Sequence, residues 1–337
     1  MTGVSSDRHE ESRTDAPEGE RIAVVTGATG FIGGYVCRTL LDRGWRVRGT
    51  VRHLDRTSDL PAGVEAVTWD IEREAAPAAL VSGAAAIIHL AGRAHRMDAS
   101  ARSDIAGYRR ANVEATRTLL GAARRAGVRR FVYVSSVKVL GEGERSPYAA
   151  DAPLDPGDAY ATSKAEAEHV VQAEAGAVRW TIVRPAFVYG AAGKGNFTRL
   201  VTLARMASRL PLPLAGLRNR RSIVYVENLA DLLVFCIESE GTAGRVVPGV
   251  DRQSVSTPEL LRGVAAPLGL RPRLFSLPSS LLALLSRISG RSADWHRLSS
   301  DFEVETSVLR EIGWRPPISF EDSFHRSARL ASAQVSA

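Results

Sequence analysis

The chain has 337 residues, of which 45% are hydrophobic and 24% charged, a balance typical of a globular protein long enough for two domains. Its two cysteines, Cys37 and Cys236, lie far apart. Two cysteines so placed exclude a disulfide framework and show no metal-ligand spacing. We therefore expect the protein to reside in a reducing cytoplasm and to have no metal site. The apolar runs at 232–237 and 277–285 are shorter than the roughly 20 residues that span a membrane.

The net charge of +7 does not predict a nucleic-acid partner, because the arginines are scattered and no basic run carries interleaved aromatics. A positive field would instead attract a phosphorylated ligand. Residues 1–20 are polar and lack the apolar core of a signal peptide. They are therefore expected to form a disordered tail, and no membrane insertion is expected.

Residues 21–34 carry a strand, a glycine turn and the start of a helix. The run RIAVVT (21–26) is typical of a buried parallel strand, and Gly27, Gly30 and Gly33 follow at intervals of three residues. Such glycines allow a tight turn and close approach of the backbone to a pyrophosphate at the helix N-terminus. The segment predicts dinucleotide binding.

The second and third strands, 45–51 and 64–69, bear on the choice of cofactor. The second strand is followed by Arg52 rather than by the acid that binds ribose hydroxyls in NAD-binding units. A guanidinium suits a 2′-phosphate, which favours NADP(H), and Asp55 leaves NAD(H) open. The third strand ends at Asp70 and Ile71, a position that can contact an adenine.

The next elements continue the alternation of strands and helices. They are the strand 84–90 with Ala91 and Gly92 after it, the helix 105–127 containing Asn112, the strand 131–134 ending at Ser135 and Ser136, and the strand 180–184 closed by Pro185. His89 is expected to be a packed residue at a strand end. The alternation predicts an α/β fold with a doubly wound, Rossmann-type parallel sheet.

After residue 185 the pattern changes to glycine- and proline-rich loops between helices. We expect residues 21–184 plus about 221–249 to form the NAD(P)-binding domain. Residues 185–220 and 250–330 are expected to form a smaller substrate-binding lobe.

Tyr160 and Lys164 lie four residues apart on a predicted helix, 158–171, with Asp158 as a plausible N-cap. A neighbouring ammonium favours the phenolate and so is expected to lower the tyrosine pKa from its usual value of about 10. The pair predicts a proton donor or acceptor for carbonyl chemistry.

Taken in order, these motifs resemble the extended short-chain dehydrogenases/reductases of the nucleotide-sugar epimerase/dehydratase family. The resemblance covers residues 21–325. It is carried by TGATGFIGG (26–34), HLAG (89–92), Asn112 in ANVEAT, YVSS (133–136), Tyr160 with Lys164, RPAFVYG (184–190) and RRSIVYVENLADL (220–232).

The resemblance implies roles for individual residues. Ser136 would hydrogen-bond the reacting sugar oxygen, Tyr160 would be the acid/base, and Lys164 would orient the nicotinamide ribose. Ser135, Ser136, Tyr160, Asn196 and Arg221 would contact the substrate, although Arg221 could also be a surface cation. The implied cofactor-binding residues are Gly27, Thr29, Gly30, Phe31, Ile32, Gly33, Arg52, Asp70, Ile71, Leu90, Ala91, Gly92, Asn112, Tyr160, Lys164 and Pro185.

One departure narrows the reaction. The 4,6-dehydratases of this family carry an Asp-Glu pair after the fifth strand, and here Ser136 is followed by Val137 and Lys138. SSVKVLGE, GKGNF (193–197) and GWRPP (313–317) resemble bacterial reductases and epimerases acting at C4 of UDP-N-acetylhexosamines for surface polysaccharides. The resemblance therefore implies an NADPH-dependent 4-ketoreductase of a UDP-4-keto-6-deoxyhexose.

Three alternatives stay open. The first is a UDP-hexose 4-epimerase that retains NAD. The second is a Rossmann-type binding protein without catalysis, and the third is a hydroxysteroid- or flavonoid-type reductase. The resemblance also implies a homodimer formed through the helices at 101–126 and 158–176. The sugar itself and the stereochemistry at C4 are not predicted.

Overall fold

The computed structural model describes residues 21–94, 104–143, 145–190, 196–288, 290, 295 and 299–335. Its main sheet has seven parallel strands in the order β3-β2-β1-β4-β5-β6-β9. The strands are β1 (Ile22–Thr26), β2 (Arg46–Val51), β3 (Val64–Thr68), β4 (Ala84–His89), β5 (Arg130–Val134), β6 (Arg179–Pro185) and β9 (Arg245–Gly249). This order is that of a doubly wound fold, so the predicted Rossmann-type architecture is confirmed.

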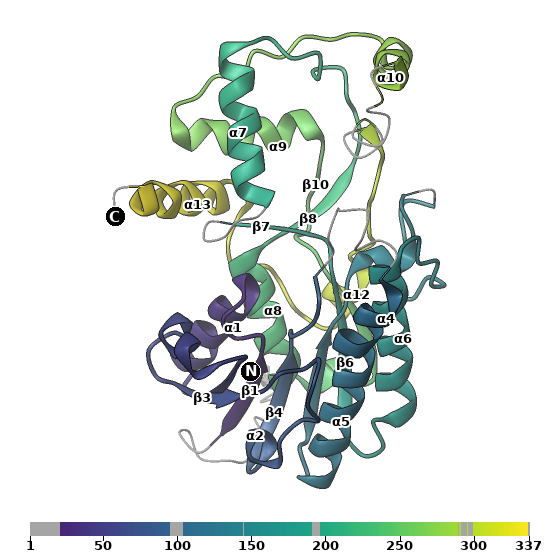
Figure 1. The fold of residues 1–337 in the computed structure, drawn as a ribbon. Helices are drawn as coiled ribbons and strands as arrows, with labels where there is room; N and C mark the ends of the chain where they lie inside the picture. Colours follow the sequence, from purple (N-terminus) through teal and green to yellow (C-terminus); the bar gives the residue numbers. More distant parts are fainter. Residues whose placement is uncertain are drawn as a thin grey trace, which may run out of the picture.

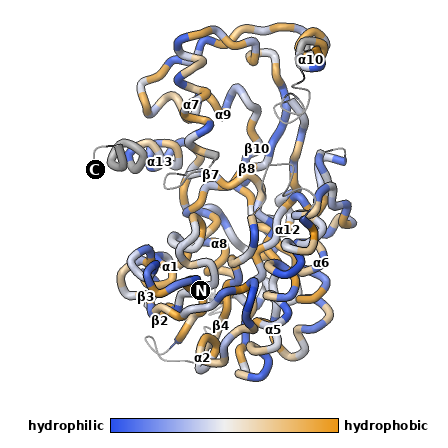
Figure 2. The backbone as a smooth tube through the Cα atoms, in the orientation of Figure 1, coloured by the Kyte–Doolittle hydropathy of each residue, from blue (hydrophilic) through white to orange (hydrophobic). Residues whose placement is uncertain are grey.

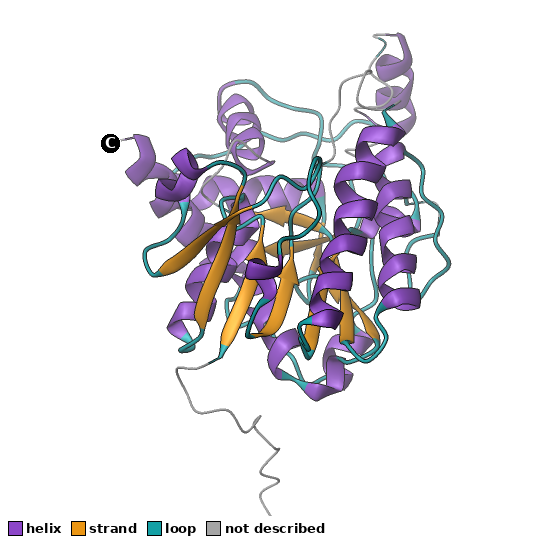
Figure 3. Ribbon diagram, turned by 60° about the horizontal axis from the view of Figure 1, so that its bottom comes forward, coloured by secondary structure: helices purple, strands orange, loops and turns teal. Residues whose placement is uncertain are grey.

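Helices cover both faces of the sheet, as Figure 3 shows. One face packs against α1 (Phe31–Asp42) and α8 (Val226–Glu238), and the other packs against α2 (Ala78–Val81), α5 (Ala115–Arg125) and α6 (Ala159–Glu174). The strands are buried on both sides because their β-branched and apolar residues face a helix layer on either side. Short elements link them: η1 (Leu54–Asp59), α4 (Ile105–Tyr108), η2 (Arg109–Glu114), η3 (Val137–Leu140) and η4 (Glu240–Thr242).

A second, smaller sheet has the order β10-β8-β7. It consists of β7 (Phe187–Tyr189), β8 (Arg221–Tyr225) and β10 (Ser254–Val255). Around and beyond it lie α7 (Asn196–Arg209), α9 (Thr257–Ala265), η5 (Ala266–Leu268), α10 (Ser279–Ile288), α12 (Ser307–Glu311) and α13 (Phe320–Val335). Figure 1 shows α7, α9 and α10 forming a second lobe beyond one end of the main sheet.

The chain between residues 221 and 249 contributes one strand to each sheet. The strand 221–225 was expected in the dinucleotide-binding domain, but it pairs with β7 and β10 in the small sheet. The main sheet instead gains its seventh strand from β9, which pairs with β6. One hydrophobic cluster runs from α1 and β1 through α8 to the aromatic side chains Tyr189 and Phe324, so the two lobes share a core.

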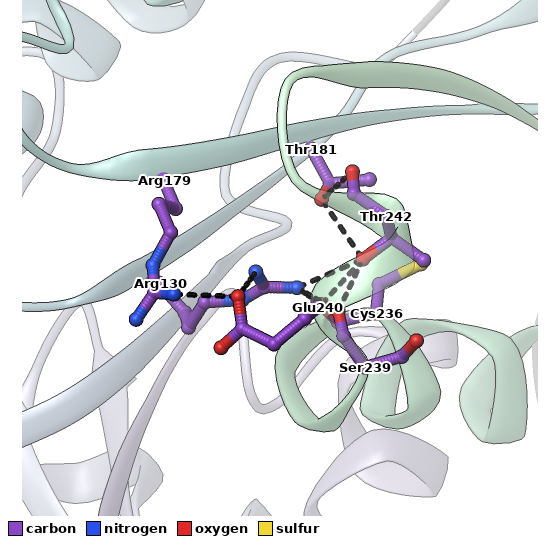
Figure 4. A network of polar contacts seen from close by, with 7 residues as sticks. All are labelled: Arg130, Arg179, Thr181, Cys236, Ser239, Glu240 and Thr242. Carbon is purple, nitrogen blue, oxygen red and sulfur yellow. Dashed lines mark hydrogen bonds and ion pairs between the residues drawn. The ribbon is translucent and has the colours of Figure 1, made fainter. Parts of the chain in front are cut away.

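Arg130 joins β5 to the C-terminus of α8, as Figure 4 shows. Its guanidinium is buried and donates to the carbonyl of Cys236 at 2.6 Å, to the hydroxyl of Thr242 at 2.8 Å and to the carbonyl of Ser239. The last carbonyls of a helix have no intrahelical partner and attract a cation. The buried arginine therefore fixes the end of α8 to the middle of the sheet.

Within the described part of the chain, no helix is long and apolar enough to cross a membrane, and no cluster of residues could hold a metal ion. Cys37 and Cys236 are both free and buried.

Candidate active site

The glycine turn between β1 and α1 can be built only from glycine at two positions. Gly27 has a φ of +70°, which side-chain-bearing residues rarely adopt. A Cβ at Gly33 would lie 2.1 Å from the Gly27 carbonyl oxygen, so α1 packs directly onto the turn. No side chain caps α1 at its N-cap, Gly30. The free backbone N–H groups of the first helical turn, with Thr29, Phe31 and Ile32 around them, fit the pyrophosphate of a dinucleotide.

The ends of β1 and β4 are joined by a buried chain of hydrogen bonds. The Thr26 hydroxyl contacts His89 Nδ1 at 2.6 Å and accepts the backbone N–H groups of Leu90 and Ala91 at 3.1 and 3.0 Å. His89 Nε2 lies 3.0 Å from the Thr116 hydroxyl. Burial lowers the pKa of His89 to about 3, so the imidazole is neutral and links the two threonine hydroxyls. It is a packed strand-end residue, as expected.

Asn112 holds the loop that follows β4. Its side-chain oxygen accepts the Arg93 N–H at 2.8 Å, and its amide donates to the Ser163 hydroxyl at 2.8 Å. A Cβ at Gly92 would lie 2.6 Å from Asn112 Oδ1 and 4.0 Å from Lys164 Nζ. Gly92, Asn112 and Lys164 thus converge. The backbone around Asn112 is a π-helical segment, η2, a local widening that is frequent at functional sites.

Tyr160 lies in the first turn of α6 and faces the residues that end β5. Asp158 caps this helix by accepting the Ala161 N–H at 2.7 Å, as predicted. Tyr160 forms a side-chain hydrogen bond with Ser136, and its ring packs edge-on against Tyr108 at a centroid distance of 6.0 Å. The structure therefore brings Ser136 and Tyr160 together.

The protonation of the Tyr160–Lys164 pair differs from the expectation. Burial raises the pKa of Tyr160 to about 12, and the hydrogen bond with Ser136 only partly opposes this. Burial also lowers the pKa of Lys164 to about 7. The Lys164 ammonium lies 4.4 Å from the centroid of the Tyr133 ring, a cation–π contact. The expected lowering of the tyrosine pKa is absent because desolvation is the largest influence and the neighbouring Asp158 and Tyr108 raise the pKa further, so Tyr160 is a protonated phenol.

A buried ion pair anchors the same helix one turn further on. Glu168 accepts two hydrogen bonds from Arg184, at 3.0 and 2.7 Å, and both side chains are almost inaccessible to solvent. Arg184 also donates to the Ala150 carbonyl at 2.8 Å. The bidentate geometry fixes α6 against β6 and so fixes the position of Tyr160 and Lys164.

Lys138 pairs with the residue that caps α6. Its ammonium lies 2.8 Å from Asp158 Oδ2 and 3.0 Å from Glu142 Oε1. These two carboxylates raise the pKa of Lys138 despite its partial burial. The residue that stands where dehydratases have an acid is therefore a cation that supports the start of the Tyr160 helix.

The remaining predicted cofactor residues lie around the carboxyl edge of the main sheet. Arg52 is exposed just after β2 and no acid stands at this strand end, where the hydroxyl of Thr50 accepts the Gly27 N–H at 3.0 Å. Asp70 is half-buried after β3 and accepts the Glu72 N–H at 3.1 Å, so it also closes a local turn. Ile71 is half-buried beside it, and Pro185 is buried at the end of β6.

The predicted substrate residues are only partly described. Ser135 is buried after β5, and its hydroxyl has no hydrogen-bond partner among the described residues. Arg221 is half-buried at the start of β8 and donates to the carbonyl and the hydroxyl of Ser300, both at 3.1 Å, so it is not a plain surface cation. Asn196 begins α7, and its side chain lies outside the described part.

Three residues of this network were not predicted as part of the site: Thr26, Thr116 and Ser163. Thr26 and His89 are register partners at the ends of adjacent parallel strands, a signal that the strand predictions contained. Ser163 donates to the Tyr160 carbonyl at 2.7 Å and accepts from Asn112. Its position three residues after Tyr160 placed it one turn along the same helix.

This geometry can be compared with known proteins. The model of the NAD dependent epimerase/dehydratase family matches residues 23–247. A UDP-glucose 4-epimerase of Vibrio cholerae is 32% identical over 313 residues, which cover 91% of this chain and 94% of the relative. A ceramide reductase of Caulobacter vibrioides is 33% identical over 266 residues, covering 78% and 75%.

A solved structure, MoeE5 in complex with UDP-glucose and NAD, has the same fold, with a TM-score of 0.72 at 20% identity over 93% of this chain and 99% of that chain. The glycine turn, the strand-end network and the Ser136–Tyr160–Lys164 group define a short-chain dehydrogenase/reductase of the extended type. More specifically, the chain belongs to the NAD-dependent epimerase/dehydratase family, and the predicted family is confirmed.

Proposed function

We propose that the protein is a cytoplasmic NAD(P)-dependent oxidoreductase acting at C4 of a UDP-linked hexose. Reduction of a 4-keto-6-deoxy-N-acetylhexosamine is the favoured reaction. The proposal depends on one observation, the protonated phenol of Tyr160, which is hydrogen-bonded to Ser136. Tyr160 lies on the same helix as the buried Lys164. The UDP-sugar substrate class is supported by the name of the Vibrio cholerae relative.

In this proposal Gly27, Gly30, Gly33, Gly92 and Asn112 hold the cofactor, and a bound nicotinamide supplies or accepts a hydride at the sugar carbon. Tyr160 donates its proton to the C4 oxygen as negative charge develops there. The Ser136 hydroxyl donates a hydrogen bond to the same oxygen.

The remaining site residues serve to bind and orient. Lys164 orients the cofactor ribose, and its charge stabilises the phenolate that remains after proton transfer. Arg221 and Asn196 bind the substrate diphosphate. Asp70, Ile71, Leu90, Ala91 and Pro185 line the cofactor site.

NADP(H) is the favoured cofactor because Arg52 is exposed where an acid would otherwise bind the ribose. The test is to mix the protein with a UDP-4-keto-6-deoxy-N-acetylhexosamine and either NADPH or NADH, and to follow the absorbance of the reduced nicotinamide. We expect oxidation that is faster with NADPH. A Tyr160→Phe variant serves as the negative control. If the protein oxidises no reduced nicotinamide with any of a panel of such ketones, the reductase assignment is wrong.

A second candidate function is 4-epimerisation, which the Vibrio cholerae relative favours. In that reaction Tyr160 acts first as base and then as acid, and the hydride returns to the other face of C4. The distinguishing measurement is the nucleotide released from heat-denatured protein. Stoichiometric NAD, together with conversion of a UDP-hexose to its C4 epimer without added cofactor, would establish the epimerase instead.

We also propose that residues 21–184 with the main-sheet strand β9 form the cofactor domain and that the second lobe binds the sugar nucleotide. A homodimer through α5 and α6 completes the proposal. The two helices pack side by side, and a groove of about 530 Å³ lies between them, lined by residues including Arg117, Glu166 and Glu174. Light scattering of the purified protein tests the dimer.

A further inference from the structure

The outer end of the second lobe carries exposed hydrophobic side chains that its own fold does not cover. Of the large hydrophobic side chains that are exposed in the described part of the chain, all but Leu54 lie in this lobe. They are Met206 and Leu210 of α7, Phe275, and Leu281, Leu284 and Ile288 of α10, and together they are called the outer face below. A concentration of this kind marks an interaction surface.

The exposed residues of α10 form a stripe. Leu281, Leu284 and Ile288 are spaced three and four residues apart, and they are 41%, 52% and 75% exposed. This spacing places them on one side of a helix. In Figure 2 the α10 helix lies at the far end of the second lobe, away from the seven-stranded sheet. No described part of the chain covers the stripe, so it is available to a partner.

Backbone hydrogen bonds join α7 to the segment that leads into α10. The Arg273 N–H donates to the Ala207 carbonyl at 2.7 Å. The Leu212 N–H donates to the Arg273 carbonyl at 2.9 Å, and the Phe275 N–H donates to the Leu212 carbonyl at 3.0 Å. Leu212 and Leu274 face inward, where they pack with Leu214 and Leu261. Arg273 and Phe275, on either side of Leu274, are exposed. The parts of the outer face on α7 and at Phe275 therefore lie on segments that are hydrogen-bonded to each other.

The two segments that carry the outer face contain charged residues of one sign only. Residues 196–226 and 260–288 contain no Asp or Glu. The exposed cations of these segments include Arg205, Arg209, Arg271, Arg273 and Arg287. None of these five forms an ion pair with another described residue, whereas arginines elsewhere in the chain are commonly paired. Exposed leucines among unpaired arginines complement an anionic lipid surface, into which the apolar side chains enter while the guanidiniums meet the headgroups.

We infer that the outer face docks the protein onto an anionic membrane surface. The attachment is peripheral, since no described helix can span a bilayer, and it adds a location to the proposed function without depending on it. The lobe proposed to bind the sugar nucleotide then lies against the membrane.

The test is co-sedimentation of the full chain with vesicles of phosphatidylcholine alone or mixed equally with phosphatidylglycerol. We expect binding to the anionic vesicles at low salt and release at high salt, where screening shortens the reach of the charges. The double variant Leu284→Gln/Ile288→Gln should bind roughly tenfold more weakly. Arg209→Gln/Arg273→Gln should lose about fivefold per arginine, on anionic vesicles only.

Two variants in the first lobe are matched controls: Leu54→Gln, which changes a side chain that is 69% exposed, and Arg125→Gln. Both should bind vesicles like the unchanged protein, and all variants should keep their thermal midpoint. Equal binding to both vesicle types, or binding that neither double variant weakens, would overturn the inference. So would a solution oligomer that Leu284→Gln/Ile288→Gln dissociates while no vesicle binds, because the outer face would then join copies of this chain.

Discussion

Particular arginines of the two lobes are used in opposite ways. In the first lobe Arg48, Arg130 and Arg184 are buried, and each guanidinium donates to backbone carbonyls or a carboxylate. In the second lobe Arg209 and Arg273 are exposed and form no ion pair with a described residue. Buried arginines fix strands and helices within the scaffold that carries the chemistry. Exposed, unpaired arginines leave their charge available to something outside the chain.

The largest effect is expected where the first lobe meets the substrate. Tyr160→Phe removes the acid and the hydrogen bond to Ser136 but keeps the ring that packs on Tyr108. Turnover should fall about 10³-fold, the range for loss of a general acid, with unchanged cofactor affinity. Steady-state kinetics and cofactor titration measure this. Tyr108→Phe is the control, since it removes a hydroxyl from the other ring of the same edge-on pair, one that donates to the Ala94 carbonyl at 3.3 Å. Unchanged turnover in Tyr160→Phe would remove Tyr160 from the mechanism.

The next effect tests the buried pair of the first lobe. Glu168→Gln leaves the Arg184 charge buried without its carboxylate. Breaking such a pair costs about 3–5 kcal/mol, so the free energy of unfolding in urea should fall by that amount. Glu166→Gln, on the same helix, breaks the exposed pair with Arg109 and should have little effect. Equal losses in both variants would contradict the distinction between buried and exposed arginine pairs.

A third prediction concerns pH. Burial holds the pKa of Lys164 at about 7 instead of 10.5. Between these values the unfolded chain binds the proton that the folded chain releases, so this residue makes stability rise with pH over that window. Below pH 7 Lys164 is charged in both the folded and the unfolded chain, so the buried ammonium lowers the free energy of unfolding by a constant amount. At about 1.4 kcal/mol per pKa unit, the free energy of unfolding of Lys164→Met at pH 7 should therefore exceed that of the unchanged protein by roughly 4 kcal/mol, and the difference should shrink towards pH 10.

Urea titrations of both proteins at several pH values measure this difference, and the variant should at the same time lose turnover. A stability difference that does not change with pH would mean that Lys164 keeps its ordinary pKa in the folded chain.

The smallest effect is expected in the second lobe. Arg221→Met removes a half-buried guanidinium held by Ser300. If this cation binds the substrate diphosphate, KM for the sugar nucleotide should rise roughly tenfold while kcat changes less. Arg220→Met is the matched control, because Arg220 is exposed and already paired with Glu303. An equal rise of KM in both variants would mean that the overall positive charge of the lobe attracts the substrate and that Arg221 makes no specific contact with it.

The sequence predicted the first lobe well because its signals are local. The spacing of Gly27, Gly30 and Gly33 reflects a contact between the turn and its own helix, and the main-sheet strands are short apolar runs. Tyr160 and Lys164 were found for the same reason, since helix geometry alone sets their relation. The predicted lowering of the Tyr160 pKa was wrong, because desolvation depends on the side chains that the fold packs around the pair.

The second lobe was harder to predict because its pairings are distant in sequence. The strand 221–225 was identified, but its apolar pattern does not say which sheet it joins, and its partners are residues 187–189 and 254–255. The outer face was missed because its leucines have the helical spacing of core residues. Only the absence of a covering element distinguishes the two cases.

The π-helical segment at Arg109–Glu114 has a consequence for how this chain tolerates change. A π-helical turn contains one residue more than the corresponding turn of an α-helix. Each residue of an α-helix advances the chain by about 100° around the helix axis. Deleting one residue on the exposed side, such as Arg110, would let α4 and α5 join as an ordinary helix. Asn112 would then turn away from Gly92 and Ser163 even though every site residue is retained. In this helix, the number of residues between α4 and α5 is therefore as much a functional constraint as their identity.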